Sequence, residues 1–95
     1  MLTNLENEIK LLRRHITILK LVIDNEPIGI VKLSEISGIP QHKVRYSLRV
    51  LEHRGLIKPS THGAVTTEKT QGYVKSLSDR LEKLAKELTK LHNIL

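Results

Sequence analysis

The stretch that decides the fold is residues 33–57, LSEISGIPQHKVRYSLRVLEHRGLI. Two helix-sized segments within it are separated by Gly38-Ile39-Pro40. Glycine suits the left-handed end of a first helix, and proline presets the backbone for the start of a second. Ile39, between them, is expected to be a buried turn residue. The first helix, over 31–37, is predicted to place three apolar side chains in the core, those of Val31, Leu33 and Ile36.

The second helix of this pair is predicted over 41–54, with Gly55 at its C-terminal end. Its apolar residues Val44, Leu48 and Leu51 have the spacing of one helical face. Two short runs rich in β-branched and small residues follow, and they can pair as a hairpin. The predicted strands are 56–60 and 64–67, around a turn at 61–63, and Pro27-Ile28-Gly29 can add a short edge strand.

A long N-terminal helix is predicted from about residue 4 to residue 24. Thr3 and Glu6 have the spacing of a capping box, and Pro27 closes a segment that stops helices. The apolar residues form two roughly opposite stripes, which predicts burial between two layers. One stripe is Leu2, Leu5, Ile9, Leu12, Ile16, Leu19 and Ile23, and the other is Leu11, Ile18 and Val22.

A second long helix is predicted over 68–94, with Thr67 as its N-cap. Its leucines step by three and four residues like a heptad seam, and a helix about 40 Å long exceeds what a small domain can cover alone. These two long helices predict a homodimer, although one intramolecular hairpin of helices is the alternative. The predicted interface contains Leu5, Ile9, Leu12, Ile16, Val74, Leu77, Leu81, Leu84, Leu88 and Leu91.

The region 33–57 resembles the helix-turn-helix and first wing strand of MarR-type, ArsR-type and archaeal winged-helix regulators. The segment from Thr67 to Gly72 is similar to the part of those proteins that leaves the wing. The chain length and the predicted elements indicate a single domain over 1–95, mainly α with a small β-hairpin (α+β). The resemblance places a winged helix-turn-helix core at 15–67, between the long helices at 4–24 and 68–95. Thr66 departs from the pattern, because those families usually carry an apolar residue there.

Charge placement supports a polyanionic partner. The formal net charge is +6, and residues 41–63 hold five Lys or Arg against one Glu. Residues 1–26 hold four basic and four acidic residues, so this segment carries no net charge. A basic segment that coincides with a helix-turn-helix is the electrostatic pattern of a double-stranded DNA-binding protein. A solvated basic surface is the alternative.

In the helix-turn-helix motif the second helix enters the major groove. The resemblance therefore implies contacts to base edges from Gln41, His42, Arg45 and Tyr46, whose side chains suit hydrogen bonding or packing there. Backbone phosphates are the expected partners of a second set, which positions the protein on DNA. This set comprises Lys43 and Arg49 on the second helix, Lys32 and Ser34 on the first, and Lys58, Ser60, Thr61 and His62 on the wing.

Other classes of function find little support. With no Cys there is no disulfide or thiolate site, and His42 and His53 are about 16 Å apart along a helix, too far to share a metal ion. No catalytic motif, cofactor site or membrane-length apolar run is present, so we expect a non-enzymatic cytoplasmic, nucleoid-associated protein. Three functions remain open. They are a sequence-specific homodimeric transcriptional regulator with an unidentified effector, a nucleoid protein of low specificity, and a winged-helix protein-interaction module.

Overall fold

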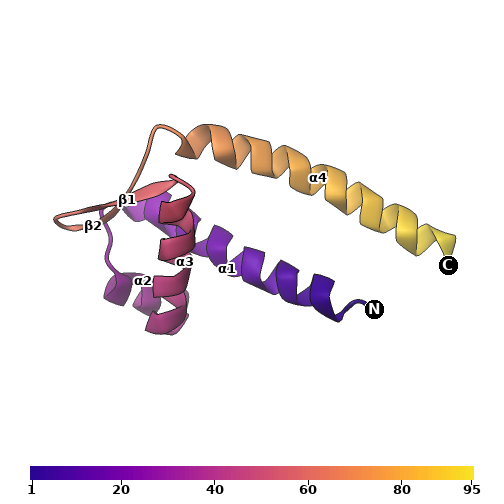
Figure 1. Cartoon of the computed structure of the whole chain (residues 1–95), viewed down its shortest axis with the longest axis horizontal. Coiled ribbons are helices and arrows are strands. Elements are labelled where there is room, and N and C mark those ends of the chain that lie inside the picture. The colour runs from indigo at the N-terminus through magenta and orange to yellow at the C-terminus, as the bar shows by residue number, and fades with distance from the viewer.

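A computed structural model describes all 95 residues as four helices and one two-stranded antiparallel hairpin. The mainly helical α+β architecture predicted from the sequence is confirmed. The elements are α1 (Thr3–Asn25), α2 (Ile30–Ser37), α3 (Gln41–His53), β1 (Ile57–Ser60), β2 (Gly63–Thr66) and α4 (Thr70–Ile94). α2, α3, the hairpin and the C-terminal half of α1 form a compact body, and the N-terminal half of α1 and all of α4 extend from it toward the same side (Figure 1).

The core lies where the C-terminal half of α1 meets α2, α3 and β1. Nine hydrophobic residues are buried there: Ile18, Leu19, Val22, Ile28, Leu33, Val44, Leu51, Leu56 and Ile57. Leu33 is fully buried as predicted, but the prediction was wrong for Val31 and Ile36, which are 56% and 46% exposed. The short α2 begins one residue earlier than predicted, and Ile30, one turn before Leu33, packs on the core instead.

The turn between α2 and α3 is fixed by local hydrogen bonds. Gly38 adopts the left-handed conformation (φ 73°), as predicted, and its N–H donates to the Ser34 carbonyl. The Ser34 hydroxyl donates to the Ile39 carbonyl at 2.6 Å, and the Ile39 N–H donates to the Ser37 hydroxyl at 3.1 Å. Ile39 itself packs half-buried against the core. These bonds set the angle at which α3 leaves α2.

The inner face of α3 carries one buried polar residue whose residue type does not indicate burial. Val44 and Leu51 are buried as predicted and Leu48 is half-buried, while Ser47 is completely buried beside them. Ser47 Oγ lies 2.7 Å from Nδ1 of His15 on α1. This contact satisfies the buried hydroxyl, whose desolvation would otherwise cost about 1–3 kcal/mol.

The hairpin pairs Ile57 with Thr66 and Ser60 with Gly63, so Pro59 lies opposite Ala64. Ile28 adds one antiparallel bridge to Ala64, which confirms the short edge contribution from this segment. Thr66, the departure from the family pattern, binds the Glu26 carboxylate through both its N–H and its hydroxyl at 2.8–3.0 Å. A polar residue at this position therefore ties β2 to the end of α1.

Two predicted N-caps are wrong. The N-cap of α1 is Leu2 with no side-chain hydrogen bond, so Thr3 and Glu6 form no capping box. Thr67 does not cap α4, which begins at Thr70. The Thr67 hydroxyl accepts from the Lys69 N–H at 3.2 Å and donates to the Gly55 carbonyl. Thr70, the buried residue of α4, donates to the Leu56 carbonyl and accepts from the Thr67 N–H. Thr67 therefore forms a local turn ahead of α4 together with a long-range bond to residue 55.

The long helices are only partly covered within one chain. On α1, Ile18 and Val22 are buried, but Leu5 and Ile9 are 43% and 44% exposed. On α4, the leucines toward the C-terminus remain exposed, and the helix reaches past the body of the domain (Figure 1). The predicted burial of α1 on two sides is therefore met within one chain only along its C-terminal half. None of the helices is long and apolar enough to cross a membrane.

Candidate nucleic-acid interface

The outward face of α3 is polar and basic. Gln41, His42, Arg45 and Arg49 are all exposed, and none of them makes a side-chain hydrogen bond or salt bridge within the chain. They are placed there because Val44, Ser47 and Leu51 occupy the inner face of the same helix. These four predicted DNA-contacting residues thus share one free surface. Their donors and acceptors are available to a partner.

Tyr46 lies differently from the other residues predicted to read bases. Its ring packs near His15 of α1, with ring centroids 5.8 Å apart, and the Arg14 guanidinium lies 5.8 Å from the ring centroid. The Tyr46 side chain is still 46% exposed. It therefore belongs to the contact between α1 and α3 as well as to the outer surface of α3.

Five further predicted residues fall into two groups. Lys32, Lys58 and His62 are exposed and unpaired, as are the four on α3. Ser34 and Ser60 use their hydroxyl protons within the chain, because Ser34 donates to the Ile39 carbonyl and Ser60 donates to the Gly63 carbonyl, both at 2.6 Å. These two hydroxyls have no proton left to donate to a phosphate in this conformation.

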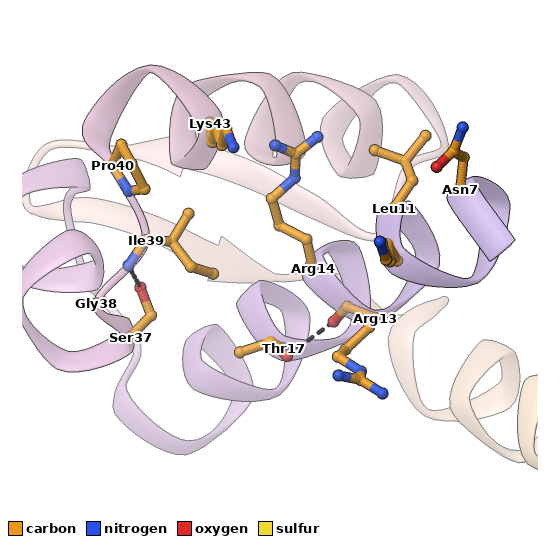
Figure 2. A pocket seen from close by; sticks show the side chains of 11 residues that line it. Asn7, Leu11, Arg13, Arg14, Thr17, Ser37, Gly38, Ile39, Pro40 and Lys43 are labelled. Atoms are coloured by element: carbon orange, nitrogen blue, oxygen red, sulfur yellow. Dashed lines mark hydrogen bonds between the residues drawn. The ribbon is translucent and has the colours of Figure 1, made fainter.

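The structure brings together a basic cluster that the charge pattern does not reveal. Lys43, at the start of α3, lines the same cavity as Lys10, Arg13 and Arg14 of α1. Figure 2 shows the Arg14 side chain reaching from α1 toward α3, on the side where Lys43 lies. The N-terminal segment has no net charge, so counting charge by segment hides its contribution. Helical phase alone places Arg13 and Arg14 outside the apolar stripes but cannot say that α3 lies beside them.

His15 is the titratable group that the fold perturbs. Burial lowers the pKa of its imidazole, and the nearby Arg14 and Arg54 guanidinium groups lower it further. The unfolded chain then binds a proton more readily than the native chain does. The resulting contribution to stability is complete above a pH of about 6.5, the ordinary pKa of His. It is lost as the pH falls from there through the lowered pKa of the folded state.

We therefore expect the free energy of unfolding to decrease as the pH is lowered below about 6.5. Urea titrations at a series of pH values measure this slope. The substitution His15→Asn removes the titrating group and should flatten the dependence between pH 6.5 and pH 5. His62→Asn, in the exposed hairpin turn, is the matched control and should leave the slope unchanged. An equal slope in wild type and His15→Asn would contradict this assignment.

A second hollow lies between the long helices. Apolar side chains of α1 and α4 line an open cleft of about 480 Å³, together with residues of α3. The cleft contains Leu12 and Ile16 from α1 and Leu77, Leu81 and Leu84 from α4. Half of the residues predicted for the dimer interface thus line one apolar surface. The other half, Leu5, Ile9, Val74, Leu88 and Leu91, are at least 37% exposed.

Comparison with solved structures identifies a similar fold. The activation domain of the phage T4 transcription factor MotA superimposes with a TM-score of 0.61, at 22% sequence identity, over 79% of this chain and 81% of that chain. No protein-family model and no curated protein sequence matches the chain. At this level of identity the similarity concerns the fold, which is one found in a transcription factor.

Proposed function

We propose that this protein is a winged helix-turn-helix transcriptional regulator that binds double-stranded DNA as a homodimer. The observation that carries the proposal is the exposed face of α3, where Gln41, His42, Arg45 and Arg49 have no partners within the chain. The order of elements, with α2, a glycine turn, α3 and a hairpin, supports a recognition-helix role for α3. The likeness to a domain of a transcription factor, and the sequence resemblance of residues 33–57, point the same way.

The proposal assigns different roles to Arg45 and Lys58. Arg45, on the free face of α3, has the donor geometry to read guanine, so Arg45→Ala should weaken specific binding by about 1–3 kcal/mol and relax preference at one base pair. Lys58, on β1, should contact phosphate, so Lys58→Ala should weaken binding to all sequences alike. Selection of bound fragments from random DNA, followed by fluorescence-anisotropy titrations, measures both effects.

Lys83→Ala, which removes one exposed and unpaired charge on α4, is the matched control. It should change neither affinity nor base preference. If Arg45→Ala leaves both unchanged, α3 is not the recognition helix. If the wild-type chain binds no duplex at low salt, the proposal of DNA binding is wrong.

The titration also separates the proposed regulator from two alternatives. A nucleoid protein of low specificity would bind selected and random duplexes with equal affinity and a steep dependence on salt. A protein-interaction module would bind neither duplex. The apolar cleft between α1 and α4 favours this last function as the second candidate, because such a surface suits a protein partner.

A further inference from the structure

The basic cavity beside α3 is lined mainly by polar and charged residues. It has a volume of about 670 Å³, and only two of its 11 lining residues are hydrophobic. Four cationic side chains line it, those of Lys10, Arg13, Arg14 and Lys43, and no Asp or Glu is among its lining residues. Figure 2 shows the α2–α3 turn at Ser37–Pro40 forming one end of the cavity. Like charges held in one hollow repel each other, so a bound anion would stabilise this arrangement.

The four cations are not neutralised within the chain. The salt bridges of the protein join Lys20 to Asp24, Lys86 to Glu82 and Lys90 to Glu87, and none involves the cavity. Arg14 adds a second observation, since its Nε is the one buried side-chain polar atom without a hydrogen-bond partner. The two outer nitrogens of the Arg14 guanidinium are neither buried nor bonded within the chain. Their N–H groups are therefore available to a ligand oxygen.

We propose that this cavity binds a phosphate group. Arginine recognises phosphate through several N–H donors in a fixed plane, and lysine adds a point charge. The Ser37 hydroxyl accepts from the Ile39 N–H, which leaves its own proton available to a ligand oxygen. Four positive charges suit a ligand with more than one negative charge, and the cavity volume lies within the usual range for small-molecule sites.

Two sources can supply the phosphate. One is a phosphodiester of DNA lying next to α3, since Lys43 belongs both to that helix and to the cavity, and this source rests on the proposed DNA-binding function. The other is a free phosphorylated small molecule, which does not depend on it. Both sources present the same phosphate chemistry to the cavity. One probe therefore tests whether the cavity binds phosphate, and a second tests whether DNA supplies that phosphate.

The first arm titrates the full-length protein with inorganic pyrophosphate by calorimetry and by NMR of the backbone amides. We expect saturable binding, with the largest shifts in residues 10–14 and 37–43. The double substitution Lys10→Gln/Lys43→Gln should weaken this binding at least tenfold. The control Lys75→Gln/Lys83→Gln removes the same charge from the exposed face of α4 and should change it less than twofold. Equal losses in the two variants, or no saturable binding by the wild type, would overturn the proposal.

The second arm measures binding of a 20-base-pair duplex at several salt concentrations. If DNA supplies the phosphate, Lys10→Gln should reduce the slope of log K against log salt by about 0.9, the value for one phosphate contact. An unchanged slope, together with lost pyrophosphate binding, assigns the cavity to a free phosphorylated molecule. If the wild type binds no duplex, the proposed DNA-binding function fails, and the pyrophosphate titration alone decides on the cavity.

Discussion

Replacing Gly63 with alanine should destabilise the protein by about 3 kcal/mol or more, a large part of the stability of a domain this size. A Cβ at this position would lie 2.5 Å from the carbonyl carbon of Ile28 and 2.8 Å from the nitrogen of Gly29. These are backbone atoms that cannot rotate away as a side chain can. Gly63 also has a φ of 129°, where residues with a side chain are strained.

The close approach at Gly63 is what lets residue 28 join the sheet. Ile28 and Ala64 exchange two backbone hydrogen bonds of 3.2 and 2.8 Å, and the buried Ile28 side chain follows into the core. A Cβ at position 63 must push these backbones apart, which breaks the bonds and uncovers the core. The damage therefore extends from the hairpin to the end of α1.

Chemical and thermal unfolding of Gly63→Ala measure the effect, and we expect the melting temperature to fall by roughly 10–20 °C. Gly72→Ala is the matched control, because a Cβ there meets no atom within 4 Å and the residue lies in α4. Alanine favours helix over glycine by up to about 1 kcal/mol, so this variant should be slightly more stable than wild type. A Gly63→Ala protein as stable as wild type would disprove the backbone clash.

The elements that could be predicted from the sequence are those with strong local determinants. The left-handed glycine at 38, the proline at 40 and the glycine at 55 mark helix boundaries with short-range backbone chemistry, and α2 and α3 follow within one residue. The end of α1 before Pro27 was predictable for the same reason. Local rules were sufficient at these helix boundaries.

Three of the features that sequence did not predict depend on distant partners. Thr67 has the residue type of an N-cap, and its hydroxyl accepts from the Lys69 N–H, but α4 begins only at Thr70. The same hydroxyl donates to the Gly55 carbonyl, 12 residues away. From the sequence alone, Thr66 only replaces an apolar residue of the family pattern. In the fold it hydrogen-bonds the carboxylate of Glu26, 40 residues away. Ser47 has the spacing of a core position but the chemistry of a surface one, and only the tertiary fold supplies His15. A single sequence does not indicate which residues, distant along the chain, form such hydrogen-bonded pairs.

In the candidate site too, features set by local helix geometry could be predicted, and features set by the packing of helices could not. The free face of α3 was predictable, because the burial of Val44 and Leu51 fixes the phase of the helix. The role of Tyr46 in the α1–α3 contact was not, since helical phase alone does not say which flank α1 covers. The basic cavity also requires the crossing of α1 and α3. Sequence can therefore indicate a face of a helix, whereas a cavity needs the packing between helices.

Dimerisation through α1 and α4 is the second large effect that we expect. In the single chain, three leucines of α4 remain largely exposed to solvent. The exposed fractions are 57% for Leu84, 44% for Leu88 and 60% for Leu91. These leucines continue the apolar surface that begins in the cleft with Leu77 and Leu81. A contiguous exposed stripe of this kind marks a protein contact, and its heptad spacing is that of a helix packing against helices. A second copy of the chain carries the same stripe. We therefore expect the stripes of two chains to pack against each other in a symmetric dimer.

The double substitution Leu84→Lys/Leu91→Lys should raise the dimer dissociation constant at least about 100-fold, because two apolar contacts of the seam become charged. Both side chains are mostly exposed in the single chain, so the monomer fold should survive, which circular dichroism checks. Ser76→Lys/Asn93→Lys adds the same charge at exposed positions off the seam and should leave dimerisation unchanged. Sedimentation equilibrium should give twice the 10.8 kDa of the chain for the wild type and the control. A folded wild-type monomer at micromolar concentration would refute the dimer, and a tight dimer of Leu84→Lys/Leu91→Lys would move its interface away from α4.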